Sequence, residues 1–69
     1  MKFDTYGKFK LDVVREADTW VAYRLEPGKR IMIHDFSIPD FFDEGQLATY
    51  LDEIYHEMGG PGDRVTRVL

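Results

Sequence analysis

The chain has 69 residues, three prolines, six glycines, no cysteine and a formal net charge of −4 at pH 7. This length predicts a single small domain over residues 1–69, with little room for a deep active site. The absence of cysteine excludes disulfides and thiolate metal sites, and no segment approaches the roughly 20 apolar residues of a membrane span, so we expect a soluble cytoplasmic protein.

The first 15 residues alternate between polar and apolar side chains. Four apolar positions are odd-numbered and form one row: Phe3, Phe9, Leu11 and Val13. A two-residue hairpin at Gly7-Lys8 would place Phe3 on the face opposite Leu11. We therefore predict one long strand that bends at Gly7, where the missing side chain tolerates a kink.

A polar turn at residues 16–19 and a second strand at residues 20–25 (WVAYRL) follow. The odd-numbered apolar residues of this strand are Val21, Tyr23 and Leu25. We expect them to share a face with the apolar row of the first strand. Side chains in a strand alternate between its two faces. The opposite face of the sheet then carries four residues: Trp20, Val14, Ala22 and Arg24.

Residues 26–29 (EPGK) indicate a tight turn before a third strand. Proline fixes φ near −65° at Pro27 and glycine permits a positive φ at Gly28, the two requirements of a type II turn. The third strand spans residues 30–38 (RIMIHDFSI). Both of its faces are apolar, so the pattern leaves its register open.

One amphipathic helix is predicted at residues 44–58. Asp43 is a favourable N-cap and Gln46 stands three residues later, a variant of the capping box. Apolar residues recur with helical spacing: Leu47, Tyr50, Leu51, Ile54, Tyr55 and Met58. The helix should stop at residues 59–61 (GGP), and residues 64–68 have the character of a short final strand.

These elements predict an α+β fold, an antiparallel three-stranded β-meander with one C-terminal amphipathic helix packed on one face (β-β-β-α) and an optional short final strand. The segments GKFKLDVVRE, WVAYRLEPGKR and LATYLDEIYHE with a closing PG resemble a family of short bacterial proteins without assigned function. The order of elements is also similar to that of HicB-type antitoxin domains. Both resemblances concern the fold, and neither implies a catalytic residue.

His56 is the residue that most resembles part of a chemical site. Asp52, Glu53 and Glu57 surround it in the sequence, and a Glu-x-x-His pair projects from one helical face. The apolar stripe of the helix, however, leaves His56 in the middle of the polar face. One histidine and flexible acids on an exposed face do not make a complete ligand set. We therefore predict no metal, no cofactor and no catalytic residue.

The function predicted from the sequence is interaction with another protein. One helix covers one face of a three-stranded sheet, yet the predicted strands are apolar on both faces. We expect the uncovered face or an edge of the sheet to bind a second copy of the chain or another protein, with an interface at Trp20, Val14, Ala22 and Arg24.

Two other classes of function are weaker predictions. Residues 1–34 carry a net charge of +2 and residues 35–69 a net charge of −6. The basic part of the sheet could bind nucleic acid, but acidic residues interleave with its Lys and Arg side chains, and phosphate neutralisation dominates such binding. A metal-binding or enzymatic protein is the third alternative.

Overall fold

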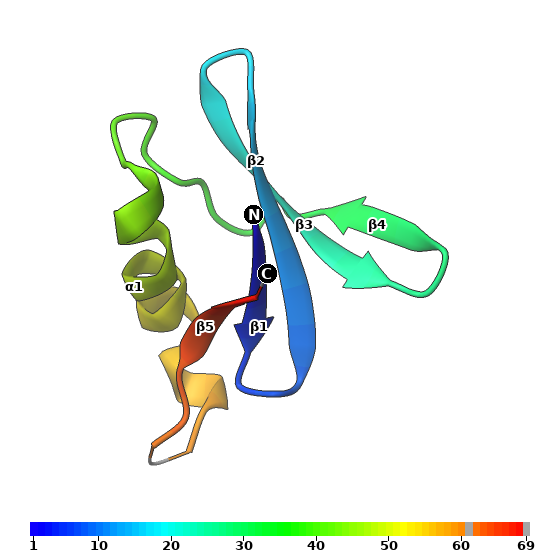
Figure 1. Cartoon of the computed structure of the whole chain (residues 1–69), viewed down its shortest axis with the longest axis vertical. Helices are drawn as coiled ribbons and strands as arrows, with labels where there is room; N and C mark the ends of the chain where they lie inside the picture. The colour runs from blue at the N-terminus through cyan, green and yellow to red at the C-terminus, as the bar shows by residue number, and fades with distance from the viewer. Residues whose placement is uncertain (61, 69) are drawn as a thin grey trace.

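The computed structural model describes residues 1–60 and 62–68, and these form one antiparallel sheet with one α-helix on one of its faces (Figure 1). The sheet has five strands: β1 (Lys2–Thr5), β2 (Phe9–Glu16), β3 (Thr19–Glu26), β4 (Lys29–Met32) and β5 (Val65–Val68). Their spatial order is β4-β3-β2-β1-β5. The α+β class is as predicted, but the prediction of three strands was wrong.

A tight hairpin joins β1 to β2, where the sequence predicted one long strand bending at Gly7. The Lys8 N–H donates to the Thr5 carbonyl over 2.9 Å, and Gly7 has a φ of 72°. The loop contains three residues, and an odd number keeps odd-numbered residues opposite one another, so Phe3 pairs with Leu11. The parity argument excluded only the two-residue loop.

A two-residue loop, Ala17-Asp18, joins β2 to β3 and reverses the predicted faces of β3. Both residues have a positive φ, 50° and 63°, as the tight hairpin turns with the twist of a sheet require. An even loop places odd-numbered residues opposite even-numbered ones, so Val13 pairs with Ala22. The prediction for this strand was therefore wrong, and the face away from the helix carries Val21, Tyr23 and Leu25.

The turn before β4 is the predicted one, and β4 itself is shorter than predicted. Gly28 has a φ of 75°, and Glu26 pairs with Lys29 across the turn. β4 ends at Met32, not at residue 38. Residues 33–43 leave the sheet and cross to the helix, and Ile38 of this crossover is buried in the core.

The helix α1 (Glu44–Tyr55) begins as predicted and continues into a 3₁₀ turn, η1 (His56–Met58). The Asp43 carboxylate accepts from the Gln46 N–H (3.1 Å), and the Gln46 amide oxygen accepts from the Asp43 N–H (2.8 Å), which confirms the capping box. The predicted stop includes Pro61, which lies outside the described residues. The predicted final strand is present as β5, paired with β1.

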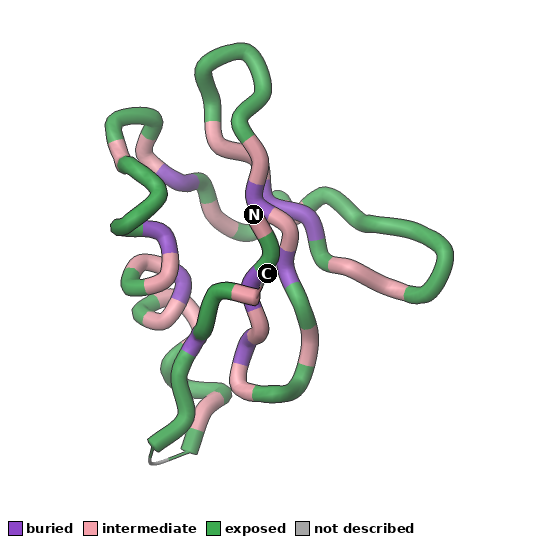
Figure 2. Tube along the Cα trace, in the orientation of Figure 1, coloured by how far each residue is buried: buried purple, intermediate pink, exposed green. Residues whose placement is uncertain are grey.

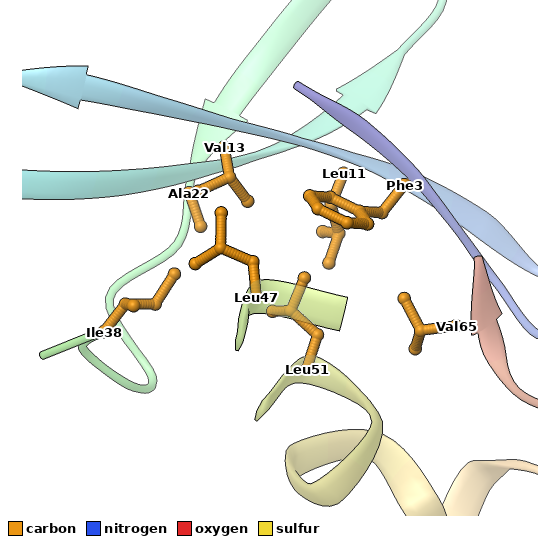
Figure 3. Close-up of a cluster of buried hydrophobic side chains, with 8 residues drawn as sticks. All are labelled: Phe3, Leu11, Val13, Ala22, Ile38, Leu47, Leu51 and Val65. Carbon is orange, nitrogen blue, oxygen red and sulfur yellow. The ribbon is translucent and has the colours of Figure 1, made fainter. Parts of the chain in front are cut away.

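The core lies between the sheet and the layer formed by α1 and the crossover (Figure 3). α1 lies against β1 and β5. Leu47 and Leu51 point from the helix towards Phe3 and Leu11, and all four side chains are almost completely buried. Each such side chain contributes about 1.5–3 kcal/mol through burial. The most completely buried side chains therefore lie in β1, β2 and the helix, and none of them belongs to β4.

Candidate functional site

The four residues predicted as an interface do not share one face of the sheet. Three of them, Trp20, Ala22 and Arg24, lie on the same face as Val13. This face is covered by the helix and the crossover. Val14 lies on the opposite face, because it neighbours Val13 in β2. Ala22 is only 6% exposed and belongs to the core. The predicted surface is thus divided between the two faces, a direct consequence of the two-residue loop before β3.

The indole of Trp20 makes its contacts within the chain. Its indole N–H donates to the Phe42 carbonyl over 2.9 Å, and the Arg15 guanidinium stacks 4.5 Å from its ring centre. Arg15 also donates to the Asp40 carbonyl over 2.8 Å. Trp20 and Arg15 therefore hold the crossover against the sheet through hydrogen bonds. This structural role was not predicted, because the sequence pattern had placed Trp20 on the face away from the helix.

The face away from the helix is partly covered by its own side chains. The Tyr23 hydroxyl donates to the Glu16 carboxylate over 2.8 Å, and the Arg30 guanidinium lies 4.2 Å from the centre of the Tyr23 ring. Tyr23 is only 9% exposed as a result. The hydrogen bond to Glu16, followed by burial and the negative charge of Glu16, raises the pKa of Tyr23. The apolar surface predicted to need a partner is therefore smaller than the pattern suggested.

The free edge of β4 is the most open part of the sheet. All four residues of β4 are exposed, and its two apolar side chains, Ile31 and Met32, are 45% and 42% exposed. Figure 2 shows the β3–β4 hairpin as a largely exposed loop at the margin of the molecule. Exposed backbone N–H and C=O groups along such an edge can pair with another strand.

The direction of the backbone groups in β4 follows from its pairing with β3. The Ile33 N–H donates to the Ala22 carbonyl over 2.9 Å, so Ile33 points its backbone groups towards β3. Hydrogen-bonding direction alternates along an antiparallel strand, and Ile31 therefore also points towards β3. Arg30 and Met32 point their N–H and C=O groups outwards. The free edge thus presents two donors and two acceptors within the strand.

A second candidate site is a cleft of about 440 Å³ beside the end of the helix. Eight residues line it: Tyr6, Thr49, Asp52, Glu53, His56, Gly59, Gly60 and Asp63. His56, Asp52 and Glu53 stand close together in the sequence, whereas Tyr6 and Asp63 are distant from them and were not predicted to belong to this site. Long-range contacts that follow from the β1–β2 hairpin and the β5 return bring these two residues to the cleft.

Tyr6 binds the hairpin loop to the helix. It has a φ of 57°, and its hydroxyl donates to the Asp52 carbonyl over 3.0 Å and contacts the Asp52 carboxylate. Burial raises the pKa of Tyr6 to about 12, with further contributions from the hydrogen bond to Asp52 and the charges of Asp52 and Asp63. Gly59 packs on the ring so closely that a Cβ there would lie 3.1 Å from it. We call these contacts of Tyr6 with Asp52 and Gly59 the clasp, because they join the β1–β2 hairpin to the end of the helix.

His56 is exposed, as the helical pattern predicted, and it too has a local partner. Its Nδ1 lies 2.8 Å from the Glu53 carbonyl, which can only accept, so Nδ1 carries the proton of this hydrogen bond. Among residues 1–60 and 62–68, no three His, Asp or Glu side chains are grouped closely enough to hold a metal ion. Among these residues the cleft therefore lacks a complete set of metal ligands, although Glu53 and His56 have the Glu-x-x-His spacing.

The basic residues of the N-terminal half are distributed over both faces of the sheet and the end of the helix. Lys8 donates to the Met58 carbonyl over 2.6 Å at the helix end. Arg24 stacks 4.5 Å from the Phe9 ring on the helix side, whereas Arg30 stacks on the opposite face. Lys2, Lys10 and Arg30 share the face away from the helix, but Asp4 and Asp12 lie among them, so this face carries mixed charge.

Comparison with known proteins identifies the family of the chain. A family model described as "Domain of unknown function (DUF7661)" matches residues 1–69, so the chain belongs to this family. Neither the curated proteins nor the solved structures gave a match. Within the part of the chain that the structure describes, no helix has the length and apolar character needed to cross a membrane.

Proposed function

We propose that this member of the DUF7661 family is a non-enzymatic protein-interaction module that binds a β-strand of its partner along the free edge of β4. The observation that carries the proposal is that all four residues of β4 are exposed and that Arg30 and Met32 point their backbone groups outwards. A strand added to this edge would gain main-chain hydrogen bonds and would contact Ile31 on one face and Met32 on the other.

The rest of the molecule supports an edge rather than a face as the binding surface. The helix and the crossover cover one face, and Tyr23 with Arg30 covers part of the other. The side chains that suggested chemistry have structural partners, since Tyr6 contacts Asp52 and His56 contacts the Glu53 carbonyl. These contacts favour an interaction module over an enzyme.

The experiment is affinity capture from lysate of the native host with the full chain and two variants of one residue. In Met32→Pro the outward N–H is lost, while the ladder to β3 is kept because Met32 does not donate to it. Met32→Val changes the side chain but keeps the N–H. We expect Met32→Pro to lose the proteins that the wild type and Met32→Val capture. Capture of the same proteins by all three would overturn an edge-mediated interaction.

A further inference from the structure

We propose that the strand that occupies this edge is β4 of a second copy of the chain, a proposal that rests on the proposed function. The two β4 strands pair antiparallel about a two-fold axis that passes beside Ile31 of each copy. This joins two five-stranded sheets into one continuous sheet. An isologous arrangement of this kind uses the same patch on both copies and closes at the dimer.

The register follows from the outward backbone groups. Antiparallel strands exchange pairs of hydrogen bonds only between residues that both point towards the shared edge, here Arg30 and Met32. Arg30 opposite the partner's Met32, and Met32 opposite the partner's Arg30, gives four hydrogen bonds. Ile31 then meets the partner's Ile31 as the close, non-hydrogen-bonded pair at the axis.

The side chains of β4 support this register. Ile31 is 45% exposed in the single chain, and a β-branched pair across the axis would cover part of that apolar surface. A shift of the partner by two residues towards the turn would set Arg30 against the partner's Arg30, a like-charge pair that destabilises a sheet. In the proposed register Lys29 instead approaches the chain that leaves β4 of the other copy, where Asp35 is exposed.

The position of the edge leaves room for a second copy. α1 packs on β1 and β5, at the end of the sheet opposite to β4, and the β3–β4 hairpin projects away from it (Figure 1). A strand of four residues gives a small contact, and interfaces below about 1,200 Å² belong to weak, transient complexes. We therefore expect a dimer that dissociates on dilution.

The test is sedimentation velocity on the purified full chain over a concentration series up to the millimolar range, with far-UV circular dichroism as the control for folding. We expect reversible dimerisation. Met32→Pro should weaken it at least about tenfold, which is about 1.4 kcal/mol, by removing two hydrogen bonds of the dimer, one donated by each copy. Ile31→Lys keeps the backbone but sets two like charges at the axis, and should weaken dimerisation to a similar extent.

Isotope-filtered nuclear Overhauser spectra on a mixture of labelled and unlabelled chains complete the test. We expect contacts between the Ile31 methyl groups of the two copies. A wild type that stays monomeric at millimolar concentration would overturn self-pairing. The proposed function would survive that result if Met32→Pro still lost a captured host protein, and would fail with it if capture were unchanged. A dimer that both variants leave intact would overturn pairing through β4.

Discussion

The two ends of the sheet differ in what holds them. At the end formed by β1 and β5, the helix covers the strands, and Phe3, Leu47 and Leu51 are buried almost completely. At the other end β4 contains no buried residue and depends on its pairing with β3 and on the turn at Gly28. The covered end therefore supplies most of the buried surface of this small domain, while the other end leaves one strand edge unpaired.

The exposed end carries features that limit uncontrolled association. β4 has only four residues, and Lys29 and Arg30 occupy its first half. Short edge strands and basic side chains are common protections against edge-to-edge aggregation. Because charge occupies one half of the strand and the apolar residues Ile31 and Met32 the other, an antiparallel copy avoids like-charge contacts, whereas a parallel, in-register stack would align them. The same residues thus permit one pairing and disfavour fibre-like stacking.

The largest expected effect separates the two ends through stability. Leu51→Ala at the covered end should reduce the free energy of unfolding by about 2–5 kcal/mol, because it removes fully buried methyl groups and leaves a cavity. A domain of this size has only a few kcal/mol of stability, so much of the variant should be unfolded at 25 °C. Ile31→Ala at the exposed end should cost less than about 0.5 kcal/mol.

Urea denaturation followed by circular dichroism measures both variants, at a concentration at which the chain is monomeric. Equal losses at the two ends would show that the β3–β4 hairpin is as much part of the cooperative core as the helix is. That result would remove the contrast on which the availability of β4 depends.

The contrast also explains which parts of the fold could be predicted from the sequence. The helix start was predictable because Asp43 and Gln46 cap each other locally, and the turn at Gly28 because proline and glycine fix its dihedral angles. The lengths of the loops at Gly7 and Ala17 were not predicted correctly. These lengths decide which face each following strand presents. Alanine gives no signal for the left-handed conformation that Ala17 adopts, and aspartate adopts that conformation only occasionally.

The candidate sites depended on those loop lengths. The sequence pattern was compatible with a two-residue loop between Glu16 and Thr19. That loop would have placed Trp20 opposite Arg15 on the helix side. The prediction of a binding edge or face was general enough to include β4, but β4 was predicted to run on to residue 38. Its early end, and the crossover that Trp20 holds, follow from long-range packing that no local pattern records.

An intermediate effect is expected where the β1–β2 hairpin meets the helix. Tyr6→Phe removes the hydroxyl that donates to the Asp52 carbonyl and contacts its carboxylate, and should cost about 1–2 kcal/mol. Tyr50→Phe is the matched control, since its hydroxyl donates to the exposed Ser37 carbonyl and carries no contact with a charged group. The loss for Tyr50→Phe should be smaller, and equal losses would show that the clasp adds nothing beyond an ordinary hydrogen bond.

The same contact predicts how the stability of the protein changes at alkaline pH. The pKa of Tyr6 is raised from 10.0 to about 12 in the folded chain, so the folded state holds this proton more tightly than the unfolded state. The resulting stabilisation is complete below pH 10 and disappears as pH rises from 10 towards 12. Tyr23 and Tyr55 shift in the same direction, so the informative quantity is the difference between variants. Tyr6→Phe should lose less stability than the wild type over this interval, as measured by urea denaturation at each pH.

The smallest effect is expected at His56, although it lies at the covered end beside the clasp. Its imidazole is exposed and contacts only the carbonyl of Glu53, one turn earlier in the helix. Substitutions of exposed side chains outside cores, caps and buried hydrogen-bond networks usually change stability only slightly. His56→Ala should therefore change the free energy of unfolding by less than about 1 kcal/mol and leave dimerisation unchanged. Metal analysis of the purified wild type and of the variant completes the measurement, and stoichiometric zinc or iron that disappears in the variant would make the cleft a metal site and contradict the clasp.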